Sequence, residues 1–140
     1  LSDMQGLNTQ KAMKMVILHD LAESIVGDFI PGDVAAKQKV AQEKNAMASI
    51  LRGLPKKVQA QYKKIWLEYL QSKTSVARFV HRLDKLEMAL QAERYAQQGY
   101  ASDLLAPFLQ TAKVAVGRES DIISEILNGL KNPKLLSSPT

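Results

Sequence analysis

The stretch VILHDLAESIVGD, Val16–Asp28, joins an apolar run to a His-Asp pair and two further carboxylates. Apolar residues recur here and just upstream at three-to-four spacing, which predicts one face of an α-helix. We expect this helix to run from Thr9, as its N-cap, to Val26, and to be broken by Gly27. Five residues form the expected apolar stripe: Met13, Val16, Ile17, Leu21 and Ile25. The chain is therefore predicted to present polar groups at the end of its first buried helix.

The same helical period continues along most of the chain, and no alternating strand pattern of useful length appears. Capping and helix-breaking residues place the later helices at about 34–52, 55–71, 75–98, 102–116 and 120–128. Expected N-caps are Asp33, Thr74 or Ser75, and Ser120. The fold class is therefore predicted to be all-α, an antiparallel-rich bundle of about six helices. We expect a single domain over residues 1–132 and a flexible tail over 133–140.

Composition excludes several classes of protein. The chain has 140 residues, of which 46% are hydrophobic and 24% charged, as in ordinary globular domains. It has no cysteine, and no apolar run approaches the ~20 residues that cross a bilayer. We expect a cytoplasmic protein with no membrane partner. The net charge of +5 and the lysines along the helices would suit nucleic acid, but few aromatic residues accompany them. A solvated basic face is the favoured interpretation.

His19, Asp20 and Glu23 are the candidate functional residues of the first helix. At about 100° per residue they fall within roughly one 100° arc of the helix. A neutral nitrogen beside hard carboxylate oxygens suits a borderline first-row metal ion. The alternative is a half-buried histidine beside a surface aspartate, and a His-Asp pair alone is weak evidence. The buried run before the pair favours the metal, since carboxylates at the edge of a core need a partner.

A second polar cluster is HRLDKLEMALQAERY, His81–Tyr95. Its expected apolar stripe consists of Val76, Val80, Leu83 and Leu90. Asp84 lies on the flank of this stripe, where the ordinary interpretation is a surface ion pair. Glu87 falls inside the stripe, and an unpaired carboxylate there would be costly. We therefore expect Glu87 to pair with an arginine or lysine of a neighbouring helix.

Together, HDLAESIVGD and the later RLDKLEMALQAERY resemble the HD-domain metal-dependent phosphohydrolases, and the 5′-deoxyribonucleotidase branch most closely. The resemblance covers roughly residues 11–95. It implies an HD-domain helical bundle and a homodimer. It also implies a divalent metal ion, left open among Mn, Co, Zn, Fe, Ni and Mg. The implied reaction is hydrolysis of (deoxy)nucleoside 5′-monophosphates.

The resemblance also assigns roles to particular residues. It makes His19 and Asp20 metal ligands, together with the distant Asp84. It gives Glu23 a catalytic role, and it gives Asp28 a contact with the sugar hydroxyl of the substrate. Each of these assignments is an expectation taken from the family pattern.

One element of the family pattern is missing. The family has a further histidine ligand and an arginine on a preceding helix, whereas the 18 residues before His19 contain neither. We expect the domain to be incomplete at its N-terminus, lacking the family's first helix, and the apolar face of the helix at 9–26 to be partly uncovered. His81 could substitute as a ligand, but a solvated histidine is the favoured interpretation.

Two other functions compete with the nucleotidase. One is a non-catalytic helical interaction protein that keeps the HD skeleton, which the missing histidine would suit. The other is a different HD-type nucleotide phosphohydrolase, acting on a cyclic dinucleotide or an alarmone. The Gly-Tyr-Pro element associated with the cyclic dinucleotide branch is absent from the sequence, so that hypothesis ranks low.

Overall fold

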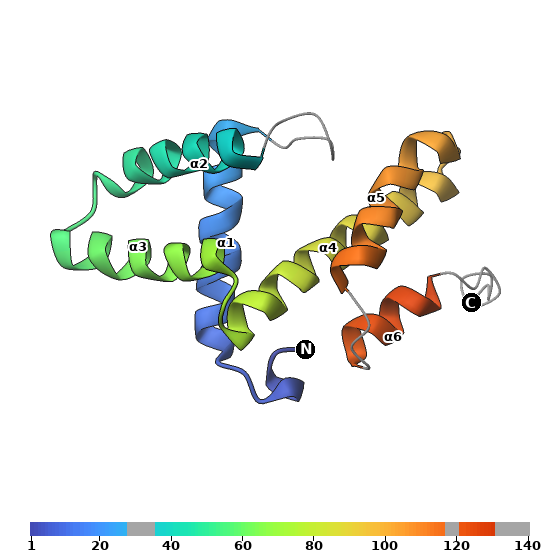
Figure 1. Ribbon diagram of the computed structural model, residues 1–140, viewed down its shortest axis with the longest axis horizontal. Helices are drawn as coiled ribbons and strands as arrows, with labels where there is room; N and C mark the ends of the chain where they lie inside the picture. Colours follow the sequence, from blue (N-terminus) through green and yellow to red (C-terminus); the bar gives the residue numbers. More distant parts are fainter. Residues whose placement is uncertain (28–35, 117–120, 131–140) are drawn as a thin grey trace. The chain divides into compact units, whose positions relative to one another are not determined.

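The computed structural model describes residues 1–27, 36–116 and 121–130 (Figure 1). Within these ranges the regular elements are all helical, which confirms the all-α fold class. They are a short 3₁₀ helix, Asp3–Gln5, and the α-helices α1 Thr9–Val26, α2 Ala36–Leu51, α3 Lys56–Gln71, α4 Ser75–Gln97, α5 Ser102–Val116 and α6 Ile122–Gly129. None of the described helices is long and apolar enough to cross a bilayer.

The chain divides into two compact units, residues 1–80 and 81–140. Helix α4 begins in the first unit and continues into the second. The expectation of a single domain over residues 1–132 stays a prediction.

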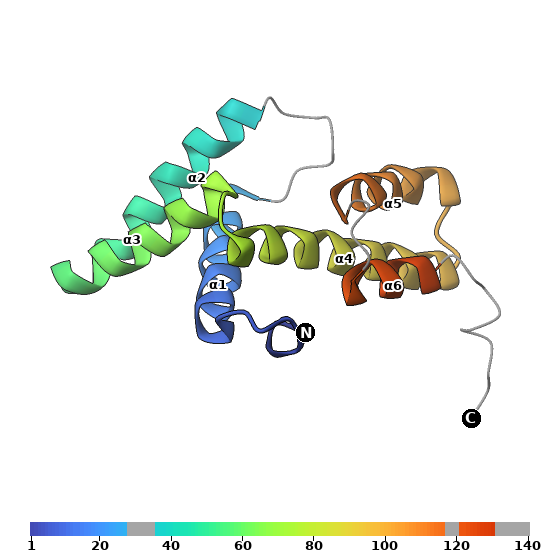
Figure 2. The same ribbon diagram turned by 60° about the horizontal axis from the view of Figure 1, so that its bottom comes forward.

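In the first unit, α1 packs against both α2 and α3, which run antiparallel to each other through a short connection (Figures 1 and 2). The sequence explains the connection, because Gly53 and Pro55 both disfavour helix continuation there. Apolar side chains from α1, α2, α3 and the start of α4 fill the core: Ala12, Met15, Leu18, Ala22, Ala46, Met47, Leu51, Ile65, Trp66, Tyr69, Val76, Ala77, Phe79 and Val80.

The apolar stripe predicted for α1 is not the buried face of the helix. Met13 is 60% exposed and Ile25 58%, and the residues between them in the stripe are half-buried or exposed. The buried face instead carries Ala12, Met15, Leu18, His19 and Ala22. Two alanines on this face let neighbouring helices approach closely, which bulkier side chains would prevent. The expectation that apolar surface of α1 lies uncovered is confirmed.

The N-cap of α1 is Asn8, whose side chain accepts a hydrogen bond of 2.9 Å from the Lys11 N–H. The prediction of Thr9 as the cap is wrong by one residue. The Thr9 hydroxyl instead forms hydrogen bonds with Asp3 and Ser2 of the preceding segment, so it does not cap the helix.

The caps of two later helices can be compared with the predictions, which were Thr74 or Ser75 for α4 and Ser120 for α6. Thr74 directly precedes the first residue of α4, and its hydroxyl accepts a hydrogen bond of 3.2 Å from the Ala77 N–H. Asp121 caps α6, accepting a bond of 3.1 Å from the Ser124 N–H. The proposed cap Asp33 lies outside the described residues. The prediction of Ser120 as the cap of α6 is wrong by one residue, because Asp121 is the cap.

Glu68 of α3 ties the first unit together. Its carboxylate accepts a hydrogen bond of 2.8 Å from Lys11 of α1 and another of 2.8 Å from the Thr74 hydroxyl. The hydrogen bond from Lys11 is the main reason that the pKa of Glu68 lies below its ordinary value, although partial burial acts in the opposite direction. One carboxylate therefore connects α1, α3 and the start of α4.

In the second unit, Arg82 of α4 links three segments. Its Nε donates to the Val116 carbonyl at the end of α5, over 3.0 Å. Its two terminal nitrogens donate to the two oxygens of Asp121 over 2.5 and 2.7 Å. The arginine is 9% exposed, so this bidentate pair is largely shielded from water.

Two predictions for α4 are wrong. Glu87 is exposed, so it needs no partner, and Leu90 of the expected stripe is 42% exposed. The buried positions of this part of the helix are Leu86, Ala89 and Ala92, at three-residue spacing. Two of these three buried residues are alanines, whereas the expected stripe consisted of bulkier valines and leucines.

Candidate functional site

His19 lies on the buried face of α1 and is 9% exposed. Its ring leans against that of Tyr69 from α3, with 4.8 Å between centroids and an interplanar angle of 36°. Its Nε2 atom is 3.5 Å from Oε1 of Glu23, one helical turn further on. The imidazole is therefore held in place by packing on one side and faces a carboxylate on the other.

Glu23 is part of a charged cluster with two residues of α2. The Lys39 ammonium lies 2.9 Å from Oε1 of Glu23 and 3.6 Å from Oε1 of Glu43. Glu43 is only 5% exposed. With a neutral His19, the cluster of His19, Glu23, Lys39 and Glu43 has two negative charges and one positive charge. One carboxylate, that of Glu23, lies directly beside the imidazole.

Lys39 and Glu43 are the residues of this cluster that the sequence interpretation missed. A signal was present, because Glu43 precedes the buried Ala46 and Met47 by three and four residues and so shares their helix face. A carboxylate on a buried face requires a cationic partner, and Lys39 stands one turn before it. The contact of Glu23 with Lys39 is an ion pair between neighbouring helices.

The other predicted site residues lie in different parts of the chain. Asp20 is exposed on α1. Asp84, in the second unit, has its Oδ2 2.8 Å from the ammonium of Lys85 and a side chain 28% exposed. His81 is half-buried. Asp28 lies outside the described residues.

Within residues 1–27, 36–116 and 121–130, no three His, Asp or Glu side chains converge as a metal-binding group. The ligand set of His19, Asp20 and Asp84 therefore stays a prediction, as do the roles of Glu23 and Asp28.

Comparison with known proteins places this site in a family. The model of a family described as HD domain matches residues 1–130. The chain belongs to the HD domain family. The His-Asp pair that resembled the family motif, His19 and Asp20, thus lies inside a matched HD domain.

Curated relatives are similar to a large part of this chain. The 5′-deoxynucleotidase HDDC2 of Dictyostelium discoideum is 41% identical over 97 residues, which cover 69% of this chain and 51% of that protein. The human 5′-deoxynucleotidase HDDC2 is 37% identical over 90 residues, 64% of this chain and 44% of that protein. The 5′-deoxynucleotidase hdd1 of Schizosaccharomyces pombe is 34% identical over 114 residues, 78% and 58% respectively. The chain spans about half the length of the curated relatives it matches.

Proposed function

We propose that this HD domain is the core of a metal-dependent phosphomonoester hydrolase that acts on deoxynucleoside 5′-monophosphates. The relatives reported above are each named 5′-deoxynucleotidase, and the HD family model covers the segment with the His-Asp pair. The observation that carries the proposal is the buried His19 imidazole with its Nε2 atom facing Glu23. A buried imidazole beside the ion-paired Glu23 and Lys39 supports a chemical role for this residue.

The donor atoms fit a divalent first-row ion. His19 supplies a nitrogen and Asp20 a carboxylate, and the family resemblance adds the carboxylate of Asp84. A divalent ion bound by such donors lowers the pKa of a water molecule and offsets charge on phosphoryl oxygens. The stacking of His19 on Tyr69 fixes the ring plane, so the imidazole would be oriented before any ion binds.

Glu23 is proposed as the general acid/base group. It lies one turn after His19, and its Oε1 is held by Lys39 at 2.9 Å. A carboxylate anchored in this way stays beside Nε2, where it can accept a proton from a water or deliver one to the leaving 5′-oxygen. Lys39 would then act as a positioning residue, with Glu43 holding its ammonium from the other side.

The remaining parts of the proposal follow from the family resemblance. Asp28 would accept a hydrogen bond from the 3′-hydroxyl of the sugar. The protein would be a cytoplasmic homodimer with a nucleoside monophosphate as its small-molecule partner.

Phosphate release from deoxynucleoside 5′-monophosphates tests the proposal. We expect turnover that a chelator abolishes and that added divalent metal restores. Asp20→Asn should remove it, while Asp103→Asn, at an exposed position in the first turn of α5, should leave it unchanged. Turnover that survives the chelator, or equal loss in both variants, would show that the proposed site is not responsible.

A further inference from the structure

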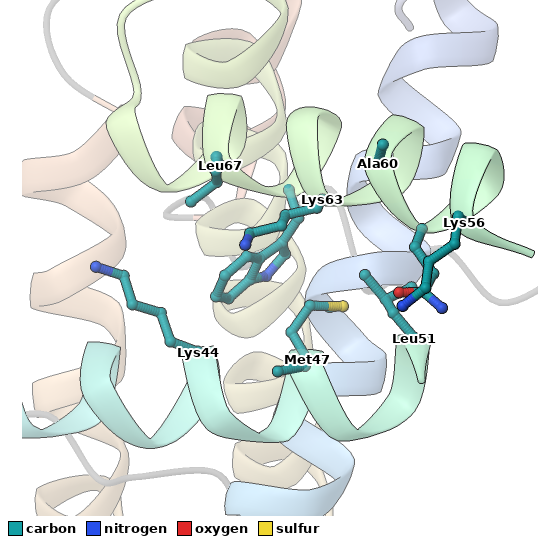
Figure 3. A pocket seen from close by; sticks show the side chains of 10 residues that line it. Lys44, Met47, Leu51, Lys56, Ala60, Lys63 and Leu67 are labelled. Atoms are coloured by element: carbon teal, nitrogen blue, oxygen red, sulfur yellow. The ribbon is translucent and has the colours of Figure 1, made fainter. Parts of the chain in front are cut away.

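A cavity of about 570 Å³ lies in the first unit between α2 and α3 (Figure 3). Its volume is within the range of roughly 300–1,000 Å³ typical of small-molecule sites. Met47 and Leu51 of α2 and Trp66 of α3 contribute its apolar lining, and each is at most 5% exposed. The floor of the cavity is thus part of the packed core, and its shape does not depend on mobile surface side chains.

Three lysines, Lys44, Lys56 and Lys63, also line the cavity, and no aspartate or glutamate does so. Figure 3 shows them on both sides of it, Lys44 from α2 and the other two from α3. All three are exposed, and none makes an ion pair or side-chain hydrogen bond with another described residue. By contrast, Lys39 and Lys11 of the same unit are each paired with a carboxylate.

Alanines keep this cavity open. Ala48 of α2 and Ala60 of α3 both line it and are exposed, so neither fills the space between the helices. A lysine face over a flat helix surface would simply be solvated. Here the three lysines line an apolar hollow that has no carboxylate in its lining, so the local charge favours an anionic ligand.

We propose that the cavity between α2 and α3 binds an amphiphilic carboxylate, an aliphatic or aryl compound with one anionic head. The apolar body would lie in the hollow against Ala48, Ala60 and Leu67, which keep accessible surface beside the buried Trp66. The carboxylate would be bound by the lysine ammonium groups. Burial of the apolar body supplies most of the affinity, and the lysines select the sign of the head group. This site uses other residues than the hydrolase proposal and does not depend on it.

Trp66 is the single tryptophan of the chain, so its fluorescence reports directly on the cavity. We would titrate the 140-residue protein with dodecanoate below its micelle concentration. The expected result is a saturable change of emission with a dissociation constant below about 1 mM. Dodecyltrimethylammonium, with the same chain length and the opposite charge, should give no saturable change.

Variants separate the apolar and ionic parts of the site. Lys44→Gln and Lys63→Gln should each weaken dodecanoate binding roughly two- to five-fold, as expected for exposed ion pairs. Lys57→Gln, the matched control, changes an exposed lysine of α3 that does not line the cavity, and it should have no effect. Ala60→Leu should abolish binding by filling the hollow, and leucine is a strong helix former.

Circular dichroism confirms that each variant is folded, and Ala48→Leu replaces Ala60→Leu if the latter is not. The inference is overturned by the absence of a saturable change with dodecanoate. Equal binding of the two amphiphiles, or equal weakening by Lys57→Gln and Lys63→Gln, would also overturn it.

Discussion

Replacing Lys39 by glutamine tests whether the charged cluster around Glu23 is energetically coupled. The ammonium lies 2.9 Å from Oε1 of Glu23 and 3.6 Å from Oε1 of Glu43. At an effective dielectric constant of about 20, the attraction at the shorter distance is roughly 6 kcal/mol. Desolvation and lost side-chain entropy offset most of this, because the Lys39 side chain is 29% exposed and that of Glu23 19%. We therefore expect Lys39→Gln to lower the free energy of unfolding by about 1–3 kcal/mol.

A double-mutant cycle isolates the Lys39–Glu23 part of that loss. Urea unfolding, followed by far-UV circular dichroism, would be measured for Lys39→Gln, Glu23→Gln and the double variant. Because the two groups are in direct contact, their coupling free energy should be about 1–2 kcal/mol. Lys57→Gln serves as the control for removal of an exposed lysine. A coupling below about 0.5 kcal/mol, the range found for independent sites, would refute the interpretation that Lys39 holds Glu23 in place.

Four further outcomes are expected. Glu23→Gln should lower turnover on deoxynucleoside 5′-monophosphates by about 10²–10⁴-fold at unchanged metal content, and near-equal turnover would remove Glu23 from the mechanism. Asp20→Ala and Asp84→Ala should each abolish metal binding with helix content retained, and the double variant should lose little more metal binding than either single variant. Unchanged metal stoichiometry in either single variant would contradict the ligand set. The pKa of Glu68 is lowered in the folded protein, so the ion pair of Glu68 stabilises the fold fully above the ordinary pKa of 4.5, and this stability is lost as the pH falls through the folded pKa. Glu68→Gln should therefore make stability depend less steeply on pH in the acid range. An unchanged dependence would show that Glu68 does not contribute to acid unfolding. Arg82→Met should destabilise the second unit by about 3–5 kcal/mol in thermal or urea unfolding, since it leaves a shielded carboxylate without its partner; a loss below 1 kcal/mol (about the value of an exposed pair) would show the contact to be solvated.

The sequence predicted helix boundaries much better than helix faces. The range Thr9–Val26 for α1 was correct, because Gly27 ends the helical period abruptly. The face was wrong because α1 has apolar residues all round, so periodicity cannot single out one side. Packing against α2 and α3 decides it, and close packing selects Ala12 and Ala22 over the bulkier Met13 and Ile17.

The candidate site shows the same division between local and distant information. His19, Asp20 and Glu23 could be found because they lie within two turns of one helix. The contact of Glu23 with Lys39 joins two different helices, so it depends on how α1 and α2 pack. No single-helix pattern contains that information. The N-cap error at Thr9 has the same origin, since a contact with Asp3 redirects the hydroxyl.

The double role of Asp121 has a consequence for the local stability of α6. The helix has eight residues, which is too short to persist in water without tertiary contacts. Asp121 both caps its first turn and accepts the bidentate pair from Arg82. If Arg82 released Asp121, the cap residue could leave the end of α6. The contact of α6 with Arg82 and the formation of the helix are therefore coupled, and both are lost together when α6 unfolds locally. Amide protons along α6 should therefore exchange with solvent at a common opening free energy, as a single foldon, and not fray gradually from one end.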